Sequence, residues 1–294
     1  MFKGSIVALI SPFKNNKLDE DSYISLIHYH LKNGTAGLVP AGTTGESPTL
    51  SHKEHERVIE LCVNESKGKI PVIAGTGSNS TSEAIALTKY AEKIGANAAL
   101  VVTPYYNKPT QEGLYQHFKS INDNSSIPII IYNIPPRSVV DMSVDTMSRL
   151  FELKNIVGVK DATGDLNRVD EQKRKMGPDF IQLSGEDGTA LEFNSRGGVG
   201  CISVTANVAP KLCSEFQEAS KSETDINLQT KAKEINELLM PLHNSLFIES
   251  NPSPVKYAAS LLNLCSDDVR LPLVKISDKS KSIIKSALIH AKLI

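Results

Sequence analysis

The 294-residue chain has almost no excess of charge of either sign, with 32 basic and 33 acidic side chains and a formal net charge of −1. The two signs are interspersed, so no basic segment is available for nucleic acid or for an anionic membrane surface. No apolar run approaches the roughly 20 residues that a membrane-crossing helix needs. The short apolar run at the N-terminus ends at Pro12 and Lys14 without a cleavage site, which argues against a signal peptide. We therefore expect a cytoplasmic protein.

Cysteine is scarce and scattered. Cys62, Cys201, Cys213 and Cys265 form no C-x-x-C pair and match no zinc-binding spacing. The sequence therefore predicts small buried thiols in a reducing compartment, with no metal site.

Short apolar runs recur eight times and are continuous rather than alternating, which is typical of parallel strands buried on both faces. They cover residues 5–10, 36–42, 71–77, 98–106, 128–135, 155–164, 180–187 and 198–207. Helix-length segments separate them, and two of these segments open with expected capping boxes, Ser51 with Glu54 and Ser80 with Glu83.

Eight strand–helix units predict an α/β fold, a (β/α)8 TIM barrel. A doubly wound open sheet is the alternative, but it would carry a glycine-rich phosphate loop after its first strand, where this chain has SPFKNNK. Residues from about 225 show three helical patterns and no strand. We expect a catalytic barrel over residues 1–224 and a C-terminal helical domain over 225–294.

The barrel predicts that active residues follow the carboxyl ends of the strands. Five such ends carry polar residues, namely GTTGE (42–46), TPYYN (103–107), YNIPPR (132–137), Lys160 and SGED (184–187). Lys160 follows four uncharged residues, and desolvation of an inward-facing lysine favours the neutral amine that attacks carbonyls. The alternatives are a side chain that extends out of the strand end or an ion pair with Asp161.

Each neighbouring candidate also has a structural interpretation. Tyr132 could transfer protons beside Lys160 or be a core tyrosine with a satisfied hydroxyl. The GTTGE loop could bind a carboxylate through its backbone amides or be a simple turn. Arg137 follows two prolines and could bind a substrate carboxylate or be a solvated surface residue. Together, the five strand ends favour a single Schiff-base site.

The motifs GTTGE, TPYYNKP (103–109), YNIPPR and GVKDATG (158–164) resemble the signature segments of the dihydrodipicolinate synthase family, a branch of the N-acetylneuraminate lyase superfamily. The segments LSGED (183–187), GVGCISVTAN (198–207) and NPSPVKYA (251–258) extend the resemblance over essentially the whole chain.

The resemblance implies a lyase that condenses pyruvate with L-aspartate 4-semialdehyde to 4-hydroxy-tetrahydrodipicolinate, a precursor of diaminopimelate and lysine. Lys160 would form an imine with pyruvate, without a metal or organic cofactor. The resemblance also implies a homotetramer, a dimer of dimers. By matched position, the resemblance implies a proton relay of Tyr132, Thr43 and Tyr106, in which Tyr106 enters from a neighbouring subunit. It implies that Thr44 binds the carboxylate of pyruvate and that Arg137 binds the carboxylate of the semialdehyde. The backbones of Gly185 and Ile202 would line the site.

A second site is implied for L-lysine as a feedback inhibitor. The positions that match the lysine pocket of lysine-sensitive family members are Ser47, Pro48, His52, His55, Asn79, Glu83 and Tyr105. Pro48 departs from the small residue, such as alanine, that is familiar there, and a proline could narrow the pocket or stiffen its loop and so change the affinity for lysine. Without the resemblance, His52 and His55 would be interpreted as a solvated helix face or, less favourably, as half of a metal site.

Two other classes of function stay open at this point. N-acetylneuraminate lyases and 2-keto-3-deoxy sugar acid aldolases share the lysine, the tyrosine and the GTTGE-like loop, but the sialic acid lyases lack an arginine at the position of Arg137. A non-catalytic pyruvate-binding barrel is disfavoured because every catalytic position that can be matched is present.

Overall fold

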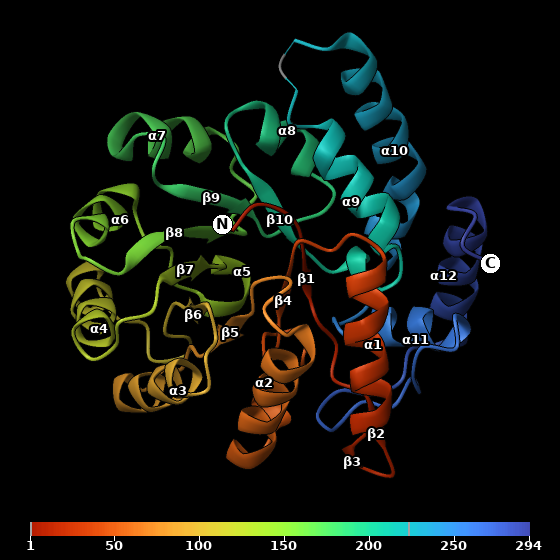
Figure 1. Ribbon diagram of the computed structural model, residues 1–294, viewed down its shortest axis with the longest axis horizontal. Coiled ribbons are helices and arrows are strands. Elements are labelled where there is room, and N and C mark those ends of the chain that lie inside the picture. The colour runs from red at the N-terminus through yellow and green to blue at the C-terminus, as the bar shows by residue number, and fades with distance from the viewer. Residues whose placement is uncertain (1, 223) are drawn as a thin grey trace.

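The computed structural model describes residues 2–222 and 224–294, and its centre is a barrel of eight parallel strands (Figure 1). The strands are β1 Gly4–Ala8, β4 Gly37–Val39, β5 Ile73–Gly75, β6 Ala98–Val102, β7 Ile129–Asn133, β8 Ile156–Asp161, β9 Ile181–Ser184 and β10 Gly200–Ser203. Their order is β4-β1-β10-β9-β8-β7-β6-β5, and a parallel bridge between Leu38 and Val72 joins the two ends. The predicted TIM barrel is confirmed, with a strand in each of the eight apolar runs.

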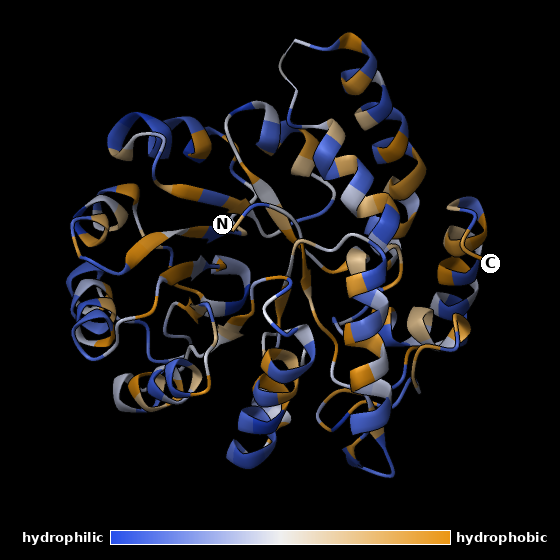
Figure 2. Cartoon of the chain, viewed as in Figure 1, coloured by the Kyte–Doolittle hydropathy of each residue, from blue (hydrophilic) through white to orange (hydrophobic). Residues whose placement is uncertain are grey.

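A ring of helices surrounds the barrel (Figure 1). The helices are α1 Glu20–Lys32, α2 His52–Ser66, α3 Thr81–Lys93, α4 Gln111–Asp123, α6 Val144–Phe151, α7 Asn167–Met176, α8 Ala190–Ser195 and α9 Pro210–Ala219. Three short turns follow strands, namely the 3-10 helix η1 Ser47–Thr49, helix α5 Pro135–Ser138 and the 3-10 helix η2 Thr205–Asn207. Figure 2 shows mixed hydropathy on the helices and mostly apolar strands, as expected where only one side of a helix faces the sheet.

The two expected capping boxes have different outcomes. Ser51 and Glu54 form the reciprocal bonds of a capping box at the start of α2. Ser80 is the N-cap residue of α3, but its side chain caps no backbone amide. The carboxylate of Glu83 accepts a hydrogen bond from Ser78 and pairs with His52. The second capping box was therefore wrong, because other groups outcompete the local contact.

The sequence analysis did not predict a small antiparallel hairpin, β2 Phe13–Lys14 with β3 Lys17–Leu18, that follows β1. Its two turn residues, Asn15 and Asn16, both adopt left-handed backbone angles, with φ of 52° and 61°. Asparagine tolerates this region better than most residues, which explains the tight turn.

The last part of the chain forms the helices α10 Ile226–Ser245, α11 Ser253–Leu261 and α12 Asp278–His290, as the three helical patterns predict. They lie along one side of the barrel, and α10 packs against α9 (Figure 1). Leu239, Val255 and Ile284 belong to the same buried apolar cluster as Val7 of β1. The C-terminal helices therefore share a hydrophobic core with the barrel. Among the residues described, no helix is both long enough and apolar enough to span a bilayer.

Candidate active site

Strand register places Lys160 beside Tyr132. The two residues are paired on β8 and β7, and the lysine Nζ lies 4.2 Å from the centre of the tyrosine ring. Tyr132 belongs to the buried cluster inside the barrel that also contains Ile202 of β10. Lys160 is only 6% exposed. Its side chain therefore lies within the barrel and does not extend out of the strand end into solvent.

Asp161 faces the opposite side of the sheet, because successive side chains of a strand alternate. Its carboxylate accepts hydrogen bonds from Gln172 of α7 at 3.0 Å and from Thr163, and it lies 3.4 Å from the Nε of Arg168. Within the described residues, Lys160 has no ion-pair partner. The structure therefore removes the Lys160–Asp161 ion pair as an explanation for this lysine.

Gly185 packs directly against the lysine stem. Its backbone amide donates to Asp161 O at 2.7 Å, which continues the β8–β9 ladder. A Cβ at position 185 would lie 3.2 Å from Cε of Lys160 and 2.7 Å from Cβ of Ala162. The position therefore has no room for a side chain unless its neighbours shift.

The GTTGE loop leaves β4 as a tight turn. The carbonyl oxygens of Gly42 and Thr43 accept bonds from the amides of Ser47 and Glu46. No acceptor lies within reach of the amides of Thr43 and Thr44 in the described parts of the chain. The loop is therefore a turn and also presents unpaired donors, so the two interpretations of its sequence are compatible.

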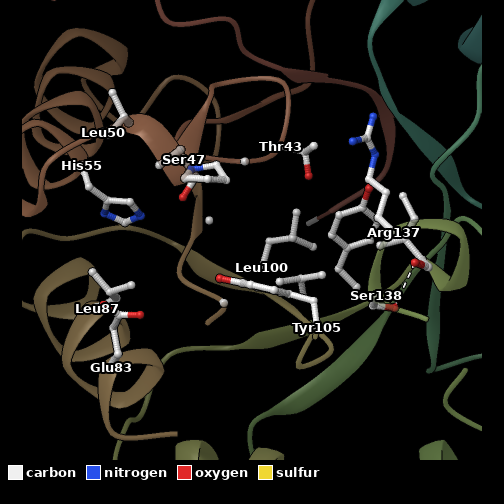
Figure 3. A pocket seen from close by; sticks show the side chains of 18 of the residues that line it. Thr43, Ser47, Leu50, His55, Glu83, Leu87, Leu100, Tyr105, Arg137 and Ser138 are labelled. Atoms are coloured by element: carbon white, nitrogen blue, oxygen red, sulfur yellow. Dashed lines mark hydrogen bonds between the residues drawn. The ribbon is translucent and has the colours of Figure 1, made fainter. Parts of the chain in front are cut away.

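A cavity of about 460 Å³ joins three residues of the expected catalytic and substrate-binding site to six of the seven residues of the expected lysine site, whereas Thr44, Gly185, Ile202 and Asn79 do not line it. Thr43, Tyr132 and Arg137 line it together with Ser47, Pro48, His52, His55, Glu83 and Tyr105. Figure 3 shows Thr43 and Arg137 at one end, His55 and Glu83 at the other, and Leu100 between them. Lys160 is not itself a lining residue, but its ammonium lies against the ring of Tyr132, which is.

The end of the cavity near α3 carries a fixed negative charge. Glu83 accepts a hydrogen bond from Ser78 and pairs with His52 Nε2 at 2.9 Å. These two contacts hold the pKa of Glu83 below its ordinary value, so it is ionised at neutral pH. Burial lowers the pKa of His55 to about 4, so this imidazole is neutral there. The arrangement suits a cationic group at Glu83.

Asn79 is hydrogen-bonded to the segment that carries the paired tyrosines, Tyr105 and Tyr106. Its amide donates to Tyr105 O at 3.2 Å, and Asn107 donates back to Asn79 O at 2.9 Å. Between them, Tyr106 has a left-handed φ of 75° and is 87% exposed. Tyr106 is the one predicted relay residue that does not line the cavity of its own chain.

Two buried residues at this site were not identified from the sequence. Asn251 and Lys256 belong to the NPSPVKYA segment, and they contact Thr44 and Glu46 of the GTTGE loop. The available signal was a lysine and an asparagine within an otherwise apolar, proline-rich stretch. Such a stretch does not reveal a contact more than 200 residues away.

Comparison with known proteins gives a consistent result. The model of the dihydrodipicolinate synthetase family matches residues 1–291. A protein of Pelagibacter ubique named 4-hydroxy-tetrahydrodipicolinate synthase is 71% identical over the full length of both chains. Among solved structures, the chloride-inhibited dihydrodipicolinate synthase of Acinetobacter baumannii in complex with pyruvate is 46% identical, with a TM-score of 0.96 and full coverage of both chains. The enzyme of Cyanidioschyzon merolae with lysine bound is 36% identical, with a TM-score of 0.95, and the match covers 100% of this chain and 99% of that one.

Proposed function

This chain belongs to the dihydrodipicolinate synthetase family, and from that premise we propose that it condenses pyruvate with L-aspartate 4-semialdehyde through an imine on Lys160. The observation that carries the proposal is the place of Lys160, buried at the end of β8 against Tyr132 and without an ion-pair partner in the described chain. A relative that is 71% identical carries the name of this synthase, and a related structure holds pyruvate.

The reaction begins when the amine of Lys160 adds to the ketone carbon of pyruvate and water leaves, which gives a protonated imine. The positive nitrogen withdraws electrons and acidifies the adjacent methyl group, so loss of one proton gives an enamine. The enamine carbon forms a bond to the aldehyde carbon of the semialdehyde. The amino group of this substrate then attacks the imine carbon, closes the ring and displaces Lys160. The imine is the electron sink, so the proposal needs no metal or organic cofactor.

The surrounding residues supply proton transfer and carboxylate binding in this proposal. Tyr132 and Thr43, together with Tyr106 from a neighbouring subunit, move protons to and from the reacting atoms. Thr44 binds the carboxylate of pyruvate, and Arg137 binds that of the semialdehyde. Arg137 is exposed at the end of α5, beside the cavity, where a guanidinium can meet an incoming anion. Gly185 and Ile202 line the site through their backbones.

Trapping with borohydride tests the role of Lys160. Reduction in the presence of pyruvate is expected to add the reduced pyruvyl group to the peptide that contains Lys160. Lys256 is the other buried lysine among the described residues, so its peptide is an internal control that should stay unmodified. Lys160→Arg should lose nearly all activity, because a guanidinium stays protonated. An adduct on any other lysine would refute the assignment.

Arg137 also favours this synthase over sugar acid lyases of the same superfamily. A coupled assay with pyruvate and aspartate semialdehyde, run beside assays with N-acetylneuraminate and 2-keto-3-deoxy sugar acids, separates the two possibilities. Preferred turnover of a sugar acid would overturn the choice of substrate, and failure of wild-type protein to trap pyruvate would support a protein that only binds.

We further propose that L-lysine inhibits the enzyme at the α3 end of the cavity. A relative has been solved with lysine bound, and here Glu83 offers an ionised carboxylate for an amino group. Inhibition of initial rates by lysine should be lost in Glu83→Ala and kept in Glu92→Ala, a control on the same helix. Equal inhibition of both variants would reject the site. Pro48→Ala should change the inhibition constant, because Pro48 lines this end.

The assembly proposed is a homotetramer built as a pair of dimers, acting in the cytoplasm. The exposed and strained Tyr106 supports a neighbouring subunit at this position, because an exposed tyrosine in a left-handed conformation has no evident use in a single chain. Sedimentation at micromolar concentration tests the assembly.

A further inference from the structure

The C-terminal helical region reaches back to the GTTGE loop through two side chains. Asn251 Nδ2 lies 3.0 Å from Thr44 Oγ1, and Lys256 Nζ lies 2.6 Å from Glu46 Oε1. These contacts join residues 207 and 210 positions apart. All four side chains are buried, with Lys256 0% and Glu46 1% exposed. The loop is thus held at two points by the same short segment.

The Lys256–Glu46 contact is the anchor of this arrangement. The ammonium also donates to Ser11 O at 2.8 Å and lies 4.2 Å from the centre of the Phe13 ring. The second oxygen of Glu46 accepts the backbone amide of Arg270 at 3.1 Å. Burial lowers the pKa of Lys256, and the charge of Glu46 opposes that shift. Both charges are therefore paired and hydrogen-bonded, and this fixes the end of the loop.

The Asn251–Thr44 contact determines the direction of a hydroxyl proton. A threonine hydroxyl has one proton to donate and can accept from other groups. Because Thr44 Oγ1 accepts from the Asn251 amide, its own proton is available to a different group. In the described residues, no protein acceptor for that proton is found. The hydroxyl is left as a donor, next to the unpaired amides of Thr43 and Thr44.

Asn251 makes this contact at an energetic cost. Its Oδ1 atom is buried and has no hydrogen-bond partner within the described part of the chain. A buried carbonyl oxygen without a partner destabilises a fold. An apolar residue would avoid that cost but would leave the orientation of the Thr44 hydroxyl undetermined.

We propose that Asn251 is a positioning residue for pyruvate, which commits the Thr44 hydroxyl to donate its proton to the substrate carboxylate. A carboxylate only accepts hydrogen bonds, so a hydroxyl turned the other way would present lone pairs to it. The inference rests on the proposed function, in which Thr44 binds the carboxylate of pyruvate. It assigns to the C-terminal region a part in substrate affinity and none in the chemical step.

Pyruvate trapping by borohydride on the full-length protein tests the proposal. Asn251→Ala should raise the half-saturating concentration of pyruvate about tenfold, equivalent to about 1.4 kcal/mol. The maximal yield of adduct on Lys160 and the KM for the semialdehyde should stay close to wild type. Asn251→Asp should raise the half-saturating concentration of pyruvate further, because a carboxylate can only accept a hydrogen bond and would make the Thr44 hydroxyl donate to residue 251 instead of to pyruvate. Asn244→Ala, an exposed asparagine at the end of α10, is the matched control and should change nothing.

A double-mutant cycle with Thr44→Val separates positioning from a general structural effect. If Asn251 acts through the hydroxyl, Asn251→Ala should have no further effect when that hydroxyl is absent. The proposal is overturned if Asn251→Ala stays within twofold of wild type, or if its effect is equally large in both backgrounds. If the alanine variant melts well below wild type, Asn251→Ser replaces it under the same criterion. Wild-type protein that traps no pyruvate would refute the proposed function instead.

Discussion

Gly185→Ala tests whether the backbone of the β9 end sets the position of Lys160. The added Cβ would lie 2.7 Å from Cβ of Ala162, while ordinary contact begins near 3.4 Å, so about 0.7 Å of separation must be found. It would also lie 3.2 Å from Cε of Lys160, which must move by a few tenths of an ångström. A third neighbour is the backbone oxygen of Asp161, at 3.0 Å. All three neighbours lie at the end of β8, and the side chain of Lys160 is the only long, flexible group among them, so the lysine stem gives way most easily.

The expected loss follows from these distances. Overpacking of a tight core costs typically about 1–3 kcal/mol, and misplacement of a reacting group by about 1 Å can lower a rate by about a hundredfold. For a shift of several tenths of an ångström we expect the rate of imine formation to fall by roughly ten- to a hundredfold. Stopped-flow mixing with pyruvate and borohydride quench measures this rate, and circular dichroism measures any loss of stability.

Gly188→Ala is the matched control, three residues along the same connection. A Cβ there would meet only Sδ of Met240, at an ordinary 3.8 Å. The control should form the imine at the wild-type rate. If Gly185→Ala does so too, with unchanged stability, the backbone at residue 185 does not position the lysine and the reasoning fails.

Three further predictions concern charge and assembly. Arg137→Ala should still trap pyruvate on Lys160, while turnover with the semialdehyde falls by a few kcal/mol of transition-state stabilisation; unchanged turnover would mean that Arg137 is a surface charge. Dilution or interface variants that produce monomers should lose activity with the loss of Tyr106 from the neighbouring site, and fully active monomers would contradict this. Hydrogen bonds from Arg270 lower the pKa of Glu54 from 4.5 to about 2, so the stability it contributes is present above pH about 4.5 and is lost as pH falls towards 2. Urea unfolding across this pH window should show that the free energy of unfolding falls less steeply with pH in Glu54→Gln than in wild type. An equal pH dependence in both proteins would refute the role of the Glu54 carboxylate.

The barrel could be predicted from the sequence because its strands are short, buried and continuous. A run such as IVGVK must be satisfied by neighbours on both faces, and a closed parallel sheet is one of few ways to achieve this. The β2–β3 hairpin was missed because two residues per strand give no periodicity. The Ser80–Glu83 capping box was wrong because Glu83 has stronger partners in Ser78 and His52 than the local backbone.

The candidate site was predictable where it depends on strand alternation. Lys160 and Tyr132 end adjacent strands, so their proximity follows from the barrel once the register is known. The interpretation of Asp161 as a partner of Lys160 failed for the same reason, because adjacent residues of a strand face opposite ways. The contacts of Asn251 and Lys256 were beyond prediction, since the docking of α11 onto the barrel depends on the tertiary packing of the whole core.

The two long-range contacts of the GTTGE loop also have a consequence during synthesis on the ribosome. Thr44 is made 207 residues before Asn251, and at about 20 residues per second this interval is at least roughly 10 s. During that time the barrel strands can pair as they are made, but Thr44 and Glu46 lack their contacts with Asn251 and Lys256. The nascent chain therefore gains these two contacts only after α11 has been made, and a chain that terminates before Asn251 lacks both of them however complete its barrel is.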